Sequence, residues 1–431
     1  MSESAEGRLL ADFVEKVGIQ TGWGSDEGCF VEVEPEVRGA LRVFSGSLGH
    51  LRPCWQEVHL NLAYRWFCRL GLEGEVPDHS TFSKNRHGRF RDSDLFRHLF
   101  EAVVQRCLDE GLVGGEGFAV DASLIHADAN KQRSLAGSDW RAQDHTQAAP
   151  RAVQEYLATL DEAAWGAATD VEPKFVSPSD PAAQWTGAMR GPAFFAYADN
   201  YLIDLKAAVI VDVEASRAVR QAEVGAARTM LERAAERFGL KPERLAGDSA
   251  YGSAEMLHWL VDEQKIDPHI PAIDKSERQD GTFSRSDFTY DLETDTYICP
   301  EGKFLTTSGR ILNEGTNRLY LGSTFDCGPC RLKEQCCPST PARRITRSIY
   351  EHAREVARSL RGTPAFERSR QGRKRIEMVF AHLKRILKMG LLRLRGPCGA
   401  QDEFLLAATA QNLRKLAKLI LPTGPEMTQG A

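Results

Sequence analysis

The stretch from residue 117 to residue 272 constrains the fold of this chain most strongly, because three strand-like segments open it in succession. GFAVDASLI (117–125) is a short apolar run that contains a single carboxylate. FFAYADNYLIDLKAAVIVDVEAS (194–216) contains two segments rich in Val, Ile, Tyr and Phe. Residues of these types are typical of half-buried strands. We therefore predict three consecutive strands at the start of this region.

The second half of the region alternates between helical and extended patterns. Residues 218–238 repeat apolar side chains at helical spacing, and Gly239 ends the pattern. A short strand before Asp248, a helix through residues 256–262 and a strand at 269–272 follow. Alternation of this kind predicts an α/β fold with helices covering a sheet, and the three early strands make that sheet mixed rather than purely parallel.

The remaining segments divide the chain into regions of different composition. A polar stretch separates the first two predicted strands, and two basic helices are expected at about 366–389 and 402–420. The predicted organisation is an atypical start (1–54), a helical DNA-binding domain (55–112), a first catalytic part (113–274), a Cys-rich insertion (275–344), a second catalytic part with the basic helix (345–421) and a tail (422–431).

The overall charge hides an uneven distribution along the chain. The sequence has 55 Lys and Arg and 60 Asp and Glu, a net charge of −5, which by itself argues against a polyanionic partner. Residues 341–431 carry 19 basic and 7 acidic side chains, a surplus of +12, so the rest of the chain carries −17. The basic C-terminal region is therefore where we expect nucleic acid to bind.

Targeting signals and cysteine usage indicate the compartment. The first residues show no apolar run of signal-peptide length, and no stretch approaches the roughly 20 apolar residues that span a bilayer. Ten cysteines without a secretion signal are typical of reduced thiols or metal ligands. We expect a bacterial-type cytoplasmic protein without a membrane partner.

Three carboxylates occupy informative positions in this pattern. Asp121 lies inside the first strand, Asp248 ends a later strand, and Glu377 lies on the basic helix. A carboxylate within an apolar strand is costly unless it is paired or bound to a metal. Carboxylates from two strands and a helix suit hard cations such as Mg²⁺, two of which can align a phosphoryl displacement. The alternative is that each aspartate only caps the turn that follows it.

The helix around Glu377 has a mixed charged stripe. Arg373, Glu377, Lys384 and Lys388 recur at steps of four, seven and four beside an apolar stripe. One interpretation is a metal ligand flanked by cations that hold phosphates. The other is a solvated face with an ordinary Arg–Glu pair.

Several segments resemble the DDE transposases of bacterial insertion sequences, whose catalytic domain has the RNase H-like fold. They are VDASLIHADAN (120–130), SPSDPAAQW (177–185), YADNYLIDLKA (197–207), GDSAYGS (247–253), the Arg-x3-Glu-x6-Lys signature, and the helical stretch at 61–90, which is similar to the N-terminal domain of the InsH-like branch. The resemblance covers about residues 55–420.

The resemblance implies a complete catalytic set. Asp121, Asp248 and Glu377 would bind two Mg²⁺ or Mn²⁺ ions, which activate water to nick the element's end before its 3′-hydroxyl attacks target DNA. Arg373 and Lys384 would bind phosphates. The implied partners are the terminal inverted repeats, target DNA and further copies of the chain, at the nucleoid when DNA is bound. The alternatives are an RNase H-like nuclease without strand transfer and a catalytically decayed DNA-binding protein.

Further DNA contacts follow from the same resemblance. Tyr251 matches the aromatic after the second aspartate, with buried packing as the equal alternative. The cluster of Lys84, Arg86 and Arg89 has interleaved aromatics and would lie on DNA in a helix-turn-helix-like reader, although such runs are commonly a charged surface. Lys388 would extend the basic stripe of the helix.

The sequence departs from the family pattern at two places. Arg370 stands where the family often has Tyr, three residues before Arg373. Residues 1–54 do not resemble the usual start, and we interpret them as degenerate through truncation or a shifted reading frame. A family-like start in another frame of the upstream DNA would support this interpretation, and its absence would exclude it.

The Cys-rich insertion has zinc-ribbon spacing. Cys299 precedes Cys327-x2-Cys330-x5-Cys336, and thiolates suit tetrahedral Zn²⁺. A structural zinc ion in this loop-rich insertion is therefore one interpretation. Four ordinary reduced thiols are the other, and Cys337 can replace Cys336 as a ligand.

Overall fold

The computed structural model describes residues 94–141, 149–162, 164–165, 172–187, 191–273, 278–312 and 315–420, with residues 59, 72–73 and 75. The chain forms two compact units, one comprising Met1–Pro242 with Gln371–Ala431 and the other comprising Glu243–Arg370. The predicted segment 1–54 and the cluster of Lys84, Arg86 and Arg89 lie outside the described residues.

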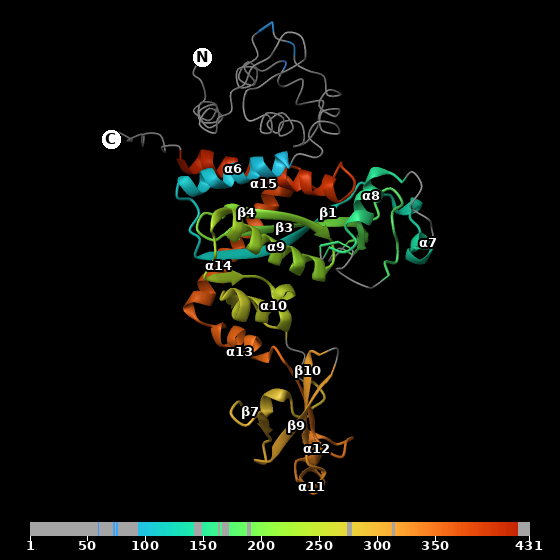
Figure 1. Ribbon diagram of the computed structural model, residues 1–431, viewed down its shortest axis with the longest axis vertical. Helices are drawn as coiled ribbons and strands as arrows, with labels where there is room; N and C mark the ends of the chain where they lie inside the picture. Colours follow the sequence, from blue (N-terminus) through green and yellow to red (C-terminus); the bar gives the residue numbers. More distant parts are fainter. Residues whose placement is uncertain are drawn as a thin grey trace, which may run out of the picture. The chain divides into compact units, whose positions relative to one another are not determined.

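The first unit is built on antiparallel strands (Figure 1). Strand β3 (Phe194–Asp204) pairs with β1 (Gly117–His126) on one side, and with β4 (Ile210–Arg217) and the short β2 (Gln184–Thr186). All but the first residue of β3 are buried. The three predicted strands are thus confirmed, and β3 is covered on both faces.

Among the described residues, six helices contribute to this unit. They are α6 (Leu95–Asp109), α7 (Gly137–Arg141), α8 (Arg151–Ala158), α9 (Arg220–Phe238), α15 (Pro397–Ile420) and the part of α14 (Pro364–Arg385) from Gln371 onward. Helix α9 contacts β3 and β4, and α15 contacts β4 and α6. Gly239 adopts a left-handed φ of 65° at the end of α9, where the sequence predicted the helix to stop.

Buried polar side chains fix helices to the edge strand β4. Asn412 of α15 donates a hydrogen bond to the Ile210 carbonyl at 2.7 Å and accepts one from the Ile210 amide at 2.9 Å. Asp212 of β4 is 2% exposed, and Arg233 of α9 contacts its carboxylate at 2.7 Å. Asn412 and Asp212 are therefore both paired, as a water-excluded interior favours.

The second unit contains a parallel strand pair with a crossover helix. Strands β5 (Arg244–Ala246) and β6 (Asp267–His269) pair in parallel, and α10 (Ala254–His258) with the π-helix Trp259–Gln264 connects them. Helix α13 (Glu351–Leu360) packs against α10 and β6.

The rest of the second unit is an antiparallel sheet with the strand order β11-β10-β9-β8-β7. Its elements are β7 (Thr289–Asp291), β8 (Thr296–Ile298), β9 (Phe304–Leu312), β10 (Asn317–Gly322) and β11 (Arg344–Ser348), with two short helices, α11 (Thr324–Cys327) and α12 (Lys333–Cys336). Its small core consists of Phe288, Tyr297, Leu305, Tyr320 and Ile345.

The order of elements defines the fold. Three antiparallel strands, a helix, a strand, a helix and a parallel strand follow one another before the antiparallel insertion and the closing helices. This is the order of the RNase H-like fold, so the predicted α/β class with a mixed set of strands is confirmed. Within the described part of the chain, no helix is long and apolar enough to cross a membrane.

Glu351 provides a test of how the second unit is held together. Its carboxylate is 1% exposed and contacts Arg285 and Arg358 at 2.8 Å and Arg354 at 3.0 Å. Burial opposes ionisation, but these guanidinium groups hold the pKa of Glu351 below its ordinary value of 4.5. We predict that Glu351→Ala lowers the free energy of unfolding in urea by about 3–5 kcal/mol, because it leaves buried cations unpaired.

The matched control is Asp326→Ala in the same unit. The Asp326 side chain is 41% exposed and lies 3.7 Å from the exposed ammonium of Lys303, so its removal should cost at most about 1 kcal/mol. Because the pKa of Glu351 is depressed, its contribution is present above pH 4.5 and is lost as the pH falls through the folded-state pKa. Equal effects of the two variants would contradict this role of Glu351.

Candidate active site

The register of β1 and β3 places polar side chains on one face of the sheet. Asp121 lies opposite Tyr201, and Ser123 lies opposite Asp199. Because alternate side chains of a strand point to the same face, these four residues share a face. The Asp121 carboxylate is partly exposed and accepts a hydrogen bond from the Ala122 amide at 2.9 Å.

Helix α14 packs over this same face. The rings of Phe380 and Tyr201 stack with centroids 4.9 Å apart and an interplanar angle of 8°. Arg375 donates hydrogen bonds to the carbonyls of Leu205 and Lys206 at 3.1 and 2.8 Å, which fixes the preceding turn of the helix beside the end of β3.

Glu377 lies on this helix, three residues before Phe380. Its side chain is exposed, whereas the apolar stripe of the helix is buried, with Ile376, Val379 and Leu383 at 0, 5 and 0% exposure. The first unit thus presents Asp121 on a strand and Glu377 on the helix that covers the same sheet face.

The basic residues of the predicted stripe separate into two groups. Arg373 and Lys384 lie on α14, as the sequence predicted. The helix ends at Arg385, however, and Lys388 follows with a left-handed φ of 53°. The prediction that Lys388 continues the helical stripe is wrong, because the chain turns back before that residue is reached.

Asp248 begins the turn that follows β5 in the second unit. Its carboxylate accepts a hydrogen bond from the Ala250 amide at 2.7 Å and so caps a single 3₁₀ turn, Ser249–Tyr251. Gly252 is required next, because a Cβ there would lie 2.0 Å from the Pro271 carbonyl oxygen. The Tyr251 side chain is 2% exposed, which favours the packing alternative over DNA contact.

The donor chemistry of the three acids fits a hard divalent cation. All three supply carboxylate oxygens, the ligands that Mg²⁺ prefers, and all remain partly or fully exposed at the surface of their own unit. Asp121 and Glu377 belong to the first unit and Asp248 to the second. Over the described ranges, no three His, Cys, Asp or Glu side chains are gathered closely enough to hold a metal ion.

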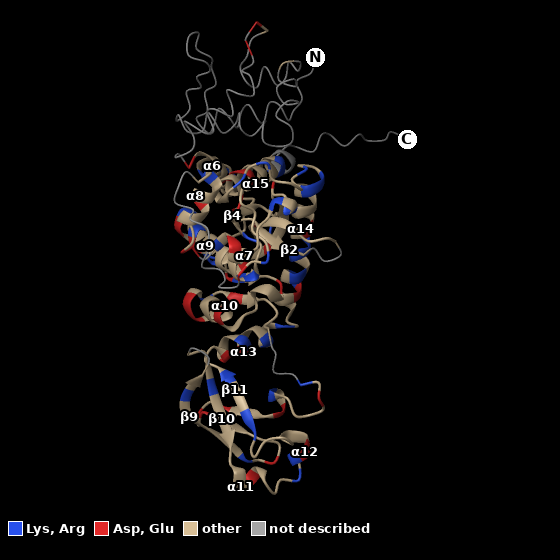
Figure 2. Cartoon of the chain, turned by 90° about the vertical axis from the view of Figure 1, so that its right-hand side faces the viewer, with Lys and Arg blue, Asp and Glu red and all other residues tan. Residues whose placement is uncertain are grey.

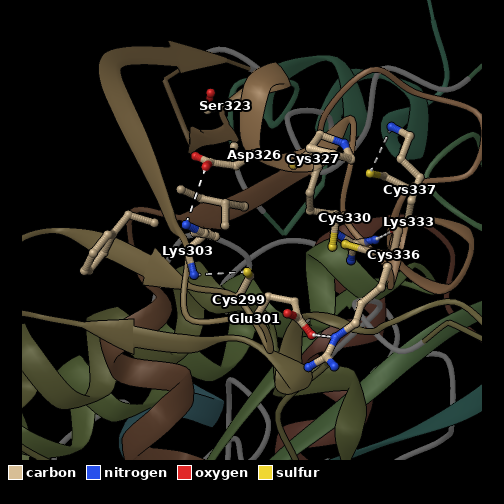
Figure 3. A pocket seen from close by; sticks show the side chains of 16 residues that line it. Cys299, Glu301, Lys303, Ser323, Asp326, Cys327, Cys330, Lys333, Cys336 and Cys337 are labelled. Atoms are coloured by element: carbon tan, nitrogen blue, oxygen red, sulfur yellow. Dashed lines mark hydrogen bonds and ion pairs between the residues drawn. The ribbon is translucent and has the colours of Figure 1, made fainter.

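Five cysteines line a second candidate site, a cavity of about 320 Å³ in the second unit (Figure 3). They are the four predicted ligands and their predicted substitute: Cys299, Cys327, Cys330, Cys336 and Cys337. The Lys303 amide donates a hydrogen bond to the Cys299 sulfur at 3.3 Å. Burial, with Cys337 close by, raises the pKa of the Cys336 thiol to about 11.

The structure adds Asp199 to the residues found from the sequence. It is fully buried on the same sheet face as Asp121. The signal in the sequence is a run of polar side chains within an otherwise apolar segment, YADNYLID. That run does not reveal which polar side chain faces the helix.

The order of strands and helices places the chain in the RNase H-like fold class. Residues 298–417 match the family described as "Transposase DDE domain", and residues 47–88 match the transposase domain DUF772. These two matches support the predicted resemblance to DDE transposases of the insertion-sequence type. The first match includes Arg373, Glu377, Lys384 and the five cysteines of the cavity.

Other comparisons are more distant. No curated protein matches the chain. Among solved structures, the chain is similar to a piggyBac transposase in a cryo-EM synaptic complex with hairpin DNA, with 10% sequence identity and a TM-score of 0.32. The match covers 96% of this chain and 64% of the piggyBac transposase chain. The present chain therefore spans less than two thirds of the length of that transposase.

The stacking of Phe380 on Tyr201 can be tested by truncation. We predict that Phe380→Ala lowers the free energy of unfolding by about 3–5 kcal/mol, the usual cost of removing a buried aromatic ring. Met378→Ala on the same helix is the control. Its side chain is 70% exposed, and its loss should change stability by no more than about 0.5 kcal/mol. A small effect of Phe380→Ala in urea unfolding would show that α14 is held by other contacts.

Proposed function

We propose that this chain catalyses end cleavage of insertion-sequence DNA and the transfer of the cut strand to target DNA. The observation that carries the proposal is the packing of α14, with Glu377, over the sheet face that bears Asp121, in a chain that matches a transposase DDE domain. Carboxylates supplied by a strand and by the helix that covers its sheet can together bind the divalent ions that phosphodiester chemistry uses.

Asp121, Asp248 and Glu377 would hold two Mg²⁺ or Mn²⁺ ions. When bound, these ions supply activation of the attacking oxygen and stabilisation of the leaving oxygen. The protein supplies rigid positions for the carboxylates: the paired strands fix Asp121, the capped turn fixes Asp248 and the stacked helix fixes Glu377. No covalent intermediate with the enzyme is needed, since positioning and charge stabilisation suffice.

The DNA would lie along the basic C-terminal region. Figure 2 shows Lys and Arg gathered at α14, and the region from residue 341 onward carries the surplus of +12. Arg373, Lys384 and Lys388 are the phosphate-binding candidates here. The candidates for recognising the terminal repeats are Lys84, Arg86 and Arg89. The first two lie within the segment that matches a transposase domain, residues 47–88, and Arg89 directly follows it. The activity would take place where bacterial DNA lies, in the cytoplasm at the nucleoid, with more than one copy of the chain joining the two ends.

The catalytic assignment can be tested with DNA that carries the element's own terminal repeats. With Mg²⁺, we expect the wild-type protein to nick the ends and join them to a second DNA. Asp121→Asn, Asp248→Asn and Glu377→Gln should each lower the cleavage rate by about a thousandfold or more, because the metal ions supply several kcal/mol of charge stabilisation.

Glu367→Gln is the control on α14. Glu367 contacts Arg370 at 2.6 Å in an exposed pair, and its loss should leave the rate within about twofold of wild type. Cleavage without joined products would identify a nuclease, and DNA binding without cleavage would identify a decayed transposase. Wild-type rates in the three acid variants would refute the proposed site.

We also propose that the five-cysteine cavity holds one structural Zn²⁺ through four thiolates. Cys299, Cys327, Cys330 and Cys336 are the proposed ligands, with Cys337 as the substitute for Cys336. Support comes from their chelating spacing in the sequence, from their position around one cavity and from the hydrogen bond that the Lys303 amide donates to the Cys299 sulfur, an interaction that favours thiolate. In this structure the thiols are not yet gathered closely enough to hold a metal ion, so zinc binding would have to draw them together. Because the ligands must lose protons, zinc binding would release protons and stabilise this small sheet.

Metal analysis of the full chain tests the zinc site. We predict about one zinc per chain when the protein is purified without chelator, and substoichiometric zinc in Cys327→Ser and Cys330→Ser. Cys398→Ser is the control, because this exposed thiol lies on α15 in the first unit. Protein without zinc, or full zinc content in the two ligand variants, would contradict the proposal.

A further inference from the structure

Asp199 is a buried carboxylate without the partners that such a group normally has. Its exposure is 0%, and among the described residues neither carboxylate oxygen makes an ion pair or a hydrogen bond of ordinary geometry; the Tyr201 hydroxyl lies close to it. Burial raises the pKa of Asp199 well above its ordinary value, and the nearby Tyr201 hydroxyl and Lys384 ammonium oppose that effect. A buried acid without a direct partner lowers the stability of the fold, and such groups cluster at functional sites. Asp199 is therefore a candidate functional residue.

A second buried aspartate on the same strand shows what full pairing looks like. Asp204 is 1% exposed, and its carboxylate accepts hydrogen bonds from the amides of Gly114, Gly115 and Lys206 at 2.8–2.9 Å. Asp204 therefore has an evident structural role in closing the β3–β4 turn. Asp199 has none of these contacts.

The path of α14 brings a cation to Asp199. Arg375 contacts the end of β3 at Leu205, and Phe380 stacks on Tyr201, so the helix advances along β3 in the direction opposite to the strand. One further turn of the helix reaches Lys384, and the next residue of β3 on this face is Asp199.

Two electrostatic effects agree with this placement of Lys384. Desolvation lowers the pKa of the Lys384 ammonium, and the negative charge of Asp199 partly offsets this lowering. Lys384 also lowers the pKa of His126, at the end of β1, in addition to the effect of desolvation. These directions agree with the path of the helix, which carries Lys384 past Phe380 toward the end of β1 that follows Asp121 and Ser123.

We propose that Asp199 is a positioning residue, whose buried carboxylate attracts the Lys384 ammonium toward the acidic face of β1 without a direct ion pair, so that Lys384 binds a DNA phosphate beside Asp121. This inference rests on the proposed function for its substrate. The flexible four-carbon stem of lysine allows the ammonium group to move between the carboxylate and the phosphate. Asp199 itself does not touch the reacting atoms.

Stability separates this role from a structural one. Asp199→Asn keeps the shape of the side chain and removes a buried carboxylate that makes no direct ion pair, so the urea midpoint should stay equal or rise. Asp204→Asn removes a charge that accepts three backbone hydrogen bonds, so its midpoint should fall. A fall in the Asp199→Asn midpoint like that of Asp204→Asn would overturn the proposal.

A second measurement reports on Lys384 without DNA. We expect an amine-acetylating reagent, followed by mass spectrometry, to label Lys384 about threefold faster in Asp199→Asn than in wild type, because the lost carboxylate no longer favours the ammonium form. Lys374, an exposed lysine of the same helix, is the internal control. Unchanged labelling of Lys384 would overturn the coupling between the two residues.

Cleavage of terminal-repeat DNA completes the test. Asp199→Asn should lower the cleavage rate about tenfold, an effect of the size measured for residues that share one network. In a Lys384→Met background, the same substitution should lower the rate less than about twofold, because the residue through which Asp199 acts is already absent. Equal effects in both backgrounds would exclude action through Lys384. If the wild-type protein cleaves no DNA, the proposed function fails. The urea midpoints and the acetylation rate of Lys384 then still decide whether Asp199 positions Lys384.

Discussion

The stacking of Phe380 on Tyr201 is the contact on which the candidate site depends. It joins the C-terminal part of the chain to a central strand that precedes it by 179 positions. Tyr201 lies opposite Asp121 in the strand pairing, and Phe380 lies one turn after Glu377. One apolar contact thus fixes the helix over the sheet face that carries Asp121. Glu377 lies on the exposed side of that helix, beside its buried apolar stripe.

Carboxylates in this chain illustrate two ways of keeping a charge in a folded interior. Asp212 and Glu351 are nearly inaccessible, and each is surrounded by guanidinium groups. Asp199 is equally inaccessible and makes no ion pair or hydrogen bond of ordinary geometry within the described part of the chain. The first kind stabilises packing between elements. A carboxylate of the second kind, such as Asp199, lowers the stability of the fold unless a cation lies near it. We therefore expect Asp199 to contribute to ligand binding rather than to folding.

Much of the catalytic scaffold can be predicted from the sequence, because its strands and helices have strong and distinct periodicities. The strands that carry Asp121 and precede Asp248, and the helix that carries Glu377, all occur where the hydrophobic pattern indicates. The end of α14 could not be predicted. The apolar repeat continues through Ile386 and Leu387, and only the left-handed backbone at Lys388 and the contact of Gly390 with His126 turn the chain back. The sheet β7–β11 could not be predicted either, because β7 and β8 have only three residues each and most residues of β9 are exposed, so neither apolar alternation nor a buried run is present there.

The burial of Asp199 was beyond sequence reasoning for a different physical reason. An aspartate at an alternate position of a strand usually indicates a solvent-facing side, because antiparallel sheets commonly have one wet face. Here both faces of β3 are covered, one by α9 and the other by α14, so the alternation carries no information about exposure. The same double coverage makes the polar positions of β3 costly. Polar residues that persist in such a strand are therefore better indicators of function than acids on the surface, where a carboxylate costs almost nothing.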